Sequence, residues 1–134
     1  MGLFSGKRPN DLGVRNGLLK ATPASPNAVS SQAAGDFHRI EPLRYKGAAE
    51  PAMAALKSII ESTPRTSIVE ERADYLYAEF SSRLIGYVDD VEFYFPPDEQ
   101  IIHLRSASRL GYSDFGVNRK RIETIRAKFA AAGV

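Results

Sequence analysis

Residues 74–108 read DYLYAEFSSRLIGYVDDVEFYFPPDEQIIHLRSAS, and this stretch decides the fold. It contains three runs, at 74–82, 86–95 and 100–108, in which apolar and polar residues alternate. Turn-forming residues separate the runs, with Ile-Gly in the first gap and PPDE in the second. Alternation with a period of two, broken by short turns, predicts antiparallel strands that follow one another as a meander.

The two turns predict a common apolar face. We take Ile85-Gly86 as a two-residue turn and residues 96–99 as a hairpin loop, which sets a register for each pair of strands. Apolar residues then face one another in the pairs Leu76–Phe95, Ala78–Phe93, Phe80–Val91, Val91–Leu104 and Phe93–Ile102. The opposite face carries the pairs Tyr77–Tyr94, Glu79–Glu92, Ser81–Asp90, Asp90–Arg105 and Glu92–His103. The run TSIVEE at 66–71 adds a fourth strand, whose register the pattern does not fix.

Helical periodicity flanks the strands on both sides. Residues 50–62 place apolar side chains three and four positions apart, between a proline in the first turn and another after the last. Residues 116–132 do the same, with a glycine beyond the end. Residues 1–36 are rich in turn formers and are expected to form an extended N-terminal arm, partly docked or flexible, before a single domain at 37–134. The expected fold is therefore α+β: a four-stranded antiparallel meander sheet, two helices packed on one face, and the arm.

The composition excludes several classes of functional site but does not identify a function. The chain has 134 residues and no cysteine, which excludes disulfides, thiolate metal sites and cysteine nucleophiles. Its formal net charge of +2 gives little attraction to phosphate backbones, so we expect no nucleic-acid partner. We find no signal-peptide pattern, lipid-anchor cysteine or transmembrane segment, and therefore expect a soluble, cytoplasmic protein. Neither a cofactor nor a metal is expected.

The carboxylates of the 86–95 run form the first candidate constellation. Asp90 and Glu92 would lie beside His103 and Arg105, a set that could bind a metal or act in acid–base chemistry, although simple cross-strand ion pairs explain it as well. Asp89 falls on the apolar face, opposite Ser82 and Ser106 in these registers, where an unpaired carboxylate would be costly. We expect it to lie near the edge of the sheet, or to be paired with Arg109, a backbone N–H of the arm or a ligand, and to have a structural role.

The second constellation is RSASRLGYSDFGVNRKR at 105–121. Serines and arginines here lead into a helix N-terminus, which could hold a phosphate, sulfate or carboxylate, although the spacing is not that of a nucleotide loop. Loop scaffolding is the competing interpretation, and a basic nucleic-acid-binding helix a weaker one. The predicted ligand-binding residues are Arg105, Ser106, Ser108, Arg109, Tyr112, Asp114, Asn118, Asn27, Ser30, Ser31 and Asp90. No catalytic residue is predicted, because a Ser–His pair could arise only through tertiary contact.

Four blocks carry a resemblance to a known family: PNAVSSQA, HRIEPLRY, GYVDDVEFYF and IIHLRSASRLGYSDFGVNRKRIETIR. In this order they resemble the domain of unknown function 1499 family, a group of uncharacterised bacterial and plastid proteins, over roughly residues 25–129. The resemblance implies no activity. Ala28 stands where the family pattern usually has cysteine, and many relatives look exported or membrane-tethered, whereas this chain shows no such leader. We expect the arm to fold across the end of the sheet so that these blocks meet.

These observations favour a non-catalytic binding or interaction domain whose partner is a small anion or another protein. The alternative is an enzyme that acts on a phosphate- or carboxylate-bearing substrate through Asp90, Arg105 and Arg109.

Overall fold

The computed structural model describes residues 5–134 and confirms the α+β class, with two helices and an antiparallel sheet. The elements are β1 (Ala28–Ser30), β2 (Leu43–Arg44), α1 (Ala49–Glu61), β3 (Thr66–Arg72), β4 (Tyr75–Ser81), β5 (Val88–Tyr94), β6 (Ile101–Ser108) and α2 (Val117–Ala131). Both helices begin and end within one residue of the predicted positions. In the part of the chain described here, no helix is both long and apolar enough to cross a membrane.

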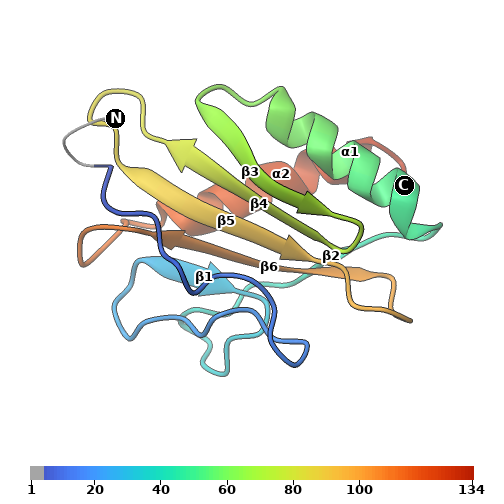
Figure 1. The fold of residues 1–134 in the computed structure, drawn as a ribbon, viewed down its shortest axis with the longest axis horizontal. Helices are drawn as coiled ribbons and strands as arrows, with labels where there is room; N and C mark the ends of the chain where they lie inside the picture. Colours follow the sequence, from blue (N-terminus) through green and yellow to red (C-terminus); the bar gives the residue numbers. More distant parts are fainter. Residues whose placement is uncertain (1–4) are drawn as a thin grey trace.

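The sheet has six strands, so the prediction of a four-stranded meander is wrong. Its order is β1-β6-β5-β4-β3, and β2 pairs with β6 beside β1 (Figure 1). Residues 28–30 of the expected arm pair with Arg105–Ala107, and Leu43–Arg44 pair with Ile101–Ile102. These short strands have no alternating pattern long enough to detect, yet they satisfy the backbone groups of β6 that would otherwise form an open edge.

The predicted strand registers are wrong by two residues, although the predicted faces are right. Ala78 faces Val91 rather than Phe93, and Val91 faces Ser106 rather than Leu104. The cause lies in the connections: the first occupies the six residues between β4 and β5, and the second the six residues between β5 and β6, so neither is as short as predicted. A shift of two preserves the face of each side chain, since strand side chains alternate with a period of two. The strand whose register the pattern left open, β3, pairs with β4 and has an irregularity between Ile68 and Glu70.

Both helices pack on the apolar face of the sheet (Figure 1). From α1, Leu56 and Ile60 are buried, and from α2, Ile122 and Phe129. They contact a sheet surface made by Leu76, Ala78, Phe80, Val91, Phe93, Ile102 and Leu104. Each large buried side chain contributes about 1.5–3 kcal/mol relative to leaving it in water, so this layer supplies most of the stabilisation.

The N-terminal arm covers the other face of the sheet, crossing in front of the strands in Figure 1. Leu19 packs among the tyrosines Tyr75, Tyr77 and Tyr94, and the backbone N–H of Gly13 donates to Glu92 Oε2 at 2.8 Å. The sheet is therefore covered on both faces. As a result, the polar face of the sheet is buried, together with its charged side chains Asp90, Glu92 and Arg105.

Candidate functional site

The predicted site residues divide between the two faces of the sheet. Because side chains alternate along β6, Arg105 points toward the arm and Ser106 toward the helices. The arm brings its own predicted residues to this region: Ser30 pairs in register with Arg105, and Asn27 O accepts from the Ser108 N–H. Tyr112 belongs to neither group, since its side chain is largely exposed. The single cluster that the sequence suggests is thus two clusters, separated by the sheet itself.

Asn118 is the centre of the helix-side cluster. Its Nδ2 donates to Asn27 O at 3.1 Å, Ser108 Oγ at 3.0 Å and Asp114 Oδ2 at 2.7 Å. Its Oδ1 accepts from Ser106 Oγ at 2.6 Å and from the guanidinium of Arg121 at 2.8 Å. Asn118 is fully buried, and its amide group has used its hydrogen-bonding capacity. This cluster joins the arm, β6 and α2, which is a structural role.

Two carboxylates complete the helix-side cluster. Asp114 accepts from the backbone N–H groups of Gly116 and Asn118 at the start of α2. Burial acts to raise the pKa of Asp114, but the hydrogen bonds from Asn118 and the helix backbone together hold it below its usual value. Asp89 pairs with Arg121 at 2.7 Å and not with Arg109, one of the partners considered from the sequence. Its register neighbours are Phe80 and Ser108 rather than Ser82 and Ser106. Burial raises the pKa of Asp89 in spite of that arginine.

On the arm side, Arg109 forms a buried ion-pair network. Its Nε donates to Asp90 Oδ2 at 2.9 Å and its Nη2 to Asp90 Oδ1 at 2.7 Å, a two-point contact, and it also pairs with Glu79. The hydroxyl of Tyr77 donates to the same Asp90 carboxylate, and burial is the main cause that raises the pKa of this tyrosine. Asp90 therefore pairs with Arg109, and the predicted Asp90–Arg105 pairing is wrong.

Arg105 is far less well satisfied than Arg109. It faces Glu92 across the strands, but Nη1 lies 3.9 Å from Glu92 Oε1, and Nη2 donates to Ala21 O at 3.4 Å. Its Nε and Glu92 Oε1 are buried and have no hydrogen-bond partner among residues 5–134. Burial lowers the pKa of Arg105 and raises that of Glu92. A guanidinium that is only 4% exposed and leaves an N–H unpaired is unusual, because buried charges are normally paired and hydrogen-bonded.

A cavity of about 270 Å³ lies beside Arg105, between the arm and the sheet. Four basic residues line it, Lys7, Lys20, Arg105 and Arg109, together with Asp90 as the acidic residue and Asn27 as an amide. Arg109 already neutralises Asp90, so the cavity keeps an excess of positive charge. Lys7 and Lys20 are not among the predicted site residues, since an isolated lysine in a turn-rich segment gives no signal by itself.

A Ser–His pair does form through tertiary contact, between Ser31 Oγ and His103 Nδ1 at 3.0 Å. Ser31 is only 3% exposed, and its Oγ also accepts from the Leu104 N–H at 2.9 Å. A nucleophile must be reachable by substrate, so this pair anchors the arm to β6 rather than carrying out catalysis. Among the described residues there is no group of three His, Asp or Glu side chains that could hold a metal.

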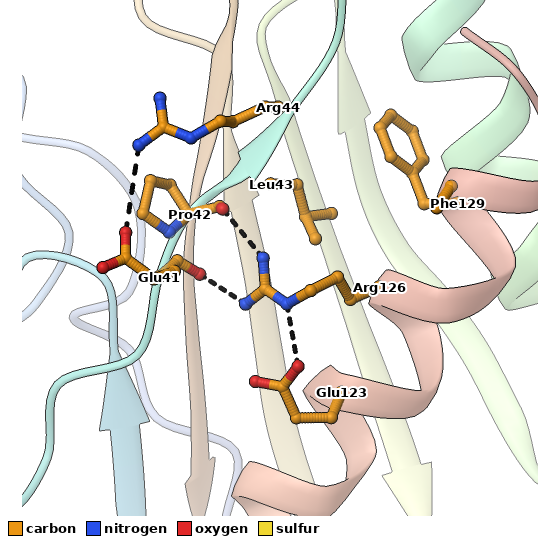
Figure 2. A pocket seen from close by; sticks show the side chains of 8 residues that line it. Glu41, Pro42, Leu43, Arg44, Glu123, Arg126 and Phe129 are labelled. Atoms are coloured by element: carbon orange, nitrogen blue, oxygen red, sulfur yellow. Dashed lines mark hydrogen bonds and ion pairs between the residues drawn. The ribbon is translucent and has the colours of Figure 1, made fainter.

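A second hollow, of about 700 Å³, lies between the segment around β2 and the C-terminal half of α2 (Figure 2). Arg126 crosses it and donates to the carbonyls of Glu41 at 2.6 Å and Pro42 at 2.9 Å, and to the Glu123 carboxylate at 2.8 Å. Figure 2 shows that these contacts tie α2 to the segment before β2. The guanidinium is satisfied by the protein, and no predicted site residue lines this hollow.

Comparison with known proteins agrees with the resemblance seen in the sequence. No curated protein and no solved structure matches the chain. A family model described as protein of unknown function (DUF1499) matches residues 18–129, which include the whole sheet, α1 and all of α2 except its last two residues. The chain therefore belongs to the DUF1499 family.

Proposed function

We propose that this domain binds a small carboxylate- or phosphate-bearing anion in the cavity between the arm and the sheet. The observation that carries the proposal is Arg105, a buried guanidinium with an unpaired Nε that lines a basic cavity. An anion placed there would accept charge-assisted hydrogen bonds that the protein itself does not supply. It would also offset the desolvation that depresses the pKa of Arg105.

The size and charge of the cavity support this ligand class. Ligand pockets usually enclose about 300–1,000 Å³, so a volume near 270 Å³ favours a small metabolite or inorganic anion over a nucleotide. Within residues 5–134 Lys20 has one ion pair, with Asp11 at 2.9 Å, and both side chains are partly exposed, so the pair is weak and Lys20 can turn toward a ligand. Lys7 is exposed and forms no ion pair within residues 5–134.

The catalytic alternative has less support. A general base must face the substrate and take up its proton, which a carboxylate fixed by a two-point ion pair is poorly placed to do. Both oxygens of Asp90 accept from Arg109, and one of them also accepts from Tyr77. Glu92, whose Oε1 has no hydrogen-bond partner among residues 5–134, is not one of the residues lining the cavity. Binding without chemistry is the function that these contacts favour.

The test measures thermal unfolding of the full chain with inorganic phosphate, sulfate, acetate or succinate. At least one anion should raise the Tm of the wild type, since ligand at about 100 times Kd stabilises the folded state by about 2.7 kcal/mol. Arg105→Met should abolish that shift, and Lys20→Met, at a partly exposed position, should reduce it without loss of fold. Arg72→Met, in a surface ion pair, is the matched control and should respond as the wild type. An equal shift in Arg105→Met, or no shift with any anion, would overturn the proposal.

A further inference from the structure

Exposed apolar side chains gather at one end of the molecule. Of the nine large apolar residues that are exposed in residues 5–134, six lie in two loops and a seventh, Val117, begins the helix that follows one of them; the other two are Leu18 and Phe37. We call the seven the end-loop patch: Leu84, Ile85 and Tyr87 between β4 and β5, Leu110, Tyr112 and Phe115 between β6 and α2, and Val117 at the start of α2. Solitary exposed apolar residues are ordinary, but a concentration of this kind marks an interaction site.

The two loops lie side by side, at the end of the sheet drawn on the left in Figure 1. Residues from both, including Tyr87 and Phe115, line one cavity of about 340 Å³. Residues 6–8 of the arm lie beside both loops. Gly6 packs against Leu110, and Arg8 shares a separate cavity with Gly86. The two loops that carry the end-loop patch therefore border one cavity, and residues of the arm lie next to them.

Phe115 occupies a position that is unfavourable for phenylalanine in both its solvent exposure and its backbone conformation. Its side chain is 94% exposed, and its backbone has φ of 52°, the left-handed region that bulky residues rarely adopt. Glycine or asparagine would fit this backbone better, and a polar residue would suit the exposure. Neither folding nor solubility accounts for a phenylalanine here, so the position indicates a function for its ring.

Positive charge surrounds the end-loop patch. Arg83 precedes Leu84, and Lys120 lies on the first turn of α2, both exposed and without an ion pair in the described part of the chain. Lys7 adds to this charge from the arm, whereas the neighbouring Arg8 is paired with Glu79 at 2.7 Å. The acidic residue of the β6–α2 connection, Asp114, has its carboxylate engaged with the backbone at the start of α2. The exposed apolar residues are thus framed by basic ones.

We propose that the end-loop patch docks this protein on an anionic lipid surface, with Leu84 and Phe115 entering the headgroup layer. Both residues are more than 90% exposed, which suits a fluid interface that closes around each of them. A folded protein partner would instead need a cavity matched to each projecting side chain. The tyrosines of the patch are of the kind enriched at membrane–water interfaces, and the surrounding basic residues attract anionic headgroups.

The experiment is sedimentation of the full chain with vesicles of phosphatidylcholine alone, or of phosphatidylcholine with phosphatidylglycerol. The wild type should bind the anionic vesicles, and bind the neutral ones more weakly. The double variant Leu84→Ser/Phe115→Asn should lose at least about tenfold in affinity, because it removes two large apolar side chains from the contact. Arg83→Glu should weaken binding to anionic vesicles by about fivefold or more.

The controls separate this surface from the rest of the molecule. Leu18→Ser removes a leucine that is 58% exposed on the arm, outside the patch, and should bind vesicles as the wild type does. Arg105→Met tests whether headgroups are captured by the interior cavity instead, and it should also leave vesicle binding unchanged. The Tm of the double variant should not fall, since asparagine tolerates the backbone of residue 115.

Three results would overturn the proposal: failure of the wild type to sediment with anionic vesicles, equal loss of binding in Leu18→Ser, or unchanged binding in the double variant. A wild type that self-associates in solution and ignores vesicles, with the double variant monomeric, would show that the patch contacts a second copy of the chain rather than a membrane.

Discussion

Removing the buried cation Arg109 should destabilise the domain far more than removing a surface arginine. The side chains of Arg109 and Asp90 are 5% and 3% exposed, and that of Glu79 is 17% exposed. Arg109→Met keeps the volume of the aliphatic part but leaves Asp90 with Tyr77 as its hydrogen-bond donor. Breaking a buried ion pair by removing one partner costs about 3–5 kcal/mol, a large share of the roughly 5–15 kcal/mol that stabilises a small domain.

Urea unfolding followed by circular dichroism measures this loss, with two further variants as references. Arg72→Met breaks a surface pair with Glu70 that has similar length, 3.0 Å, but partners about half exposed, and should cost at most about 1 kcal/mol. The double variant Arg109→Met/Asp90→Asn should lose less than Arg109→Met alone, because no buried charge is left without its partner. Equal losses for Arg109→Met and Arg72→Met, or a double variant less stable than the single one, would refute the reasoning.

Two further predictions concern the other buried polar groups. Asn118→Ala removes five side-chain hydrogen bonds, each worth about 1 kcal/mol. Urea unfolding should show that it lowers the free energy of unfolding by about 3–5 kcal/mol. The control Lys120→Ala, at an exposed residue on the same turn, should change that free energy by less than about 0.5 kcal/mol. Burial, and to a lesser degree Arg39, lowers the pKa of His103, so the folded state favours the neutral ring. The stabilisation from neutral His103 is complete above its ordinary pKa of about 6.5 and is lost as pH falls through the lower folded-state value. His103→Asn should therefore show a smaller drop in Tm between neutral and mildly acidic pH than the wild type, and an unchanged drop would contradict this assignment.

The sequence predicted the two helices, the strands β3 to β6 and the apolar face of the sheet. These features depend on local periodicity, which a run of ten or so residues carries by itself. The strands β1 and β2 were missed because strands of three and two residues have no period to detect. Their existence depends on the edge of β6, which only the folded chain presents.

The candidate site was harder to predict than the fold. The sequence singled out Arg105 and Arg109 together, but it could not show that one is fully paired while the other is not. That difference arises because the real register places Arg105 opposite Glu92, two residues from the predicted pairing with Asp90. It also arises because the arm closes the cavity with Lys7 and Lys20, which no pattern connects to β6.

The sequence by itself thus determined which side chains share a face, since alternation along a strand is unchanged by a shift of two residues. It also marked the polar blocks that the DUF1499 match contains. Only the tertiary structure decided which charges meet, because partners across strands depend on the lengths of the connections. The burial of the polar face was also decided only by the tertiary structure. The arm that covers this face is held by long-range contacts, such as those of Leu19 with the tyrosines and of Gly13 with Glu92. Those contacts form between residues that lie some 60 to 80 positions apart, and local pattern carries no information over that distance.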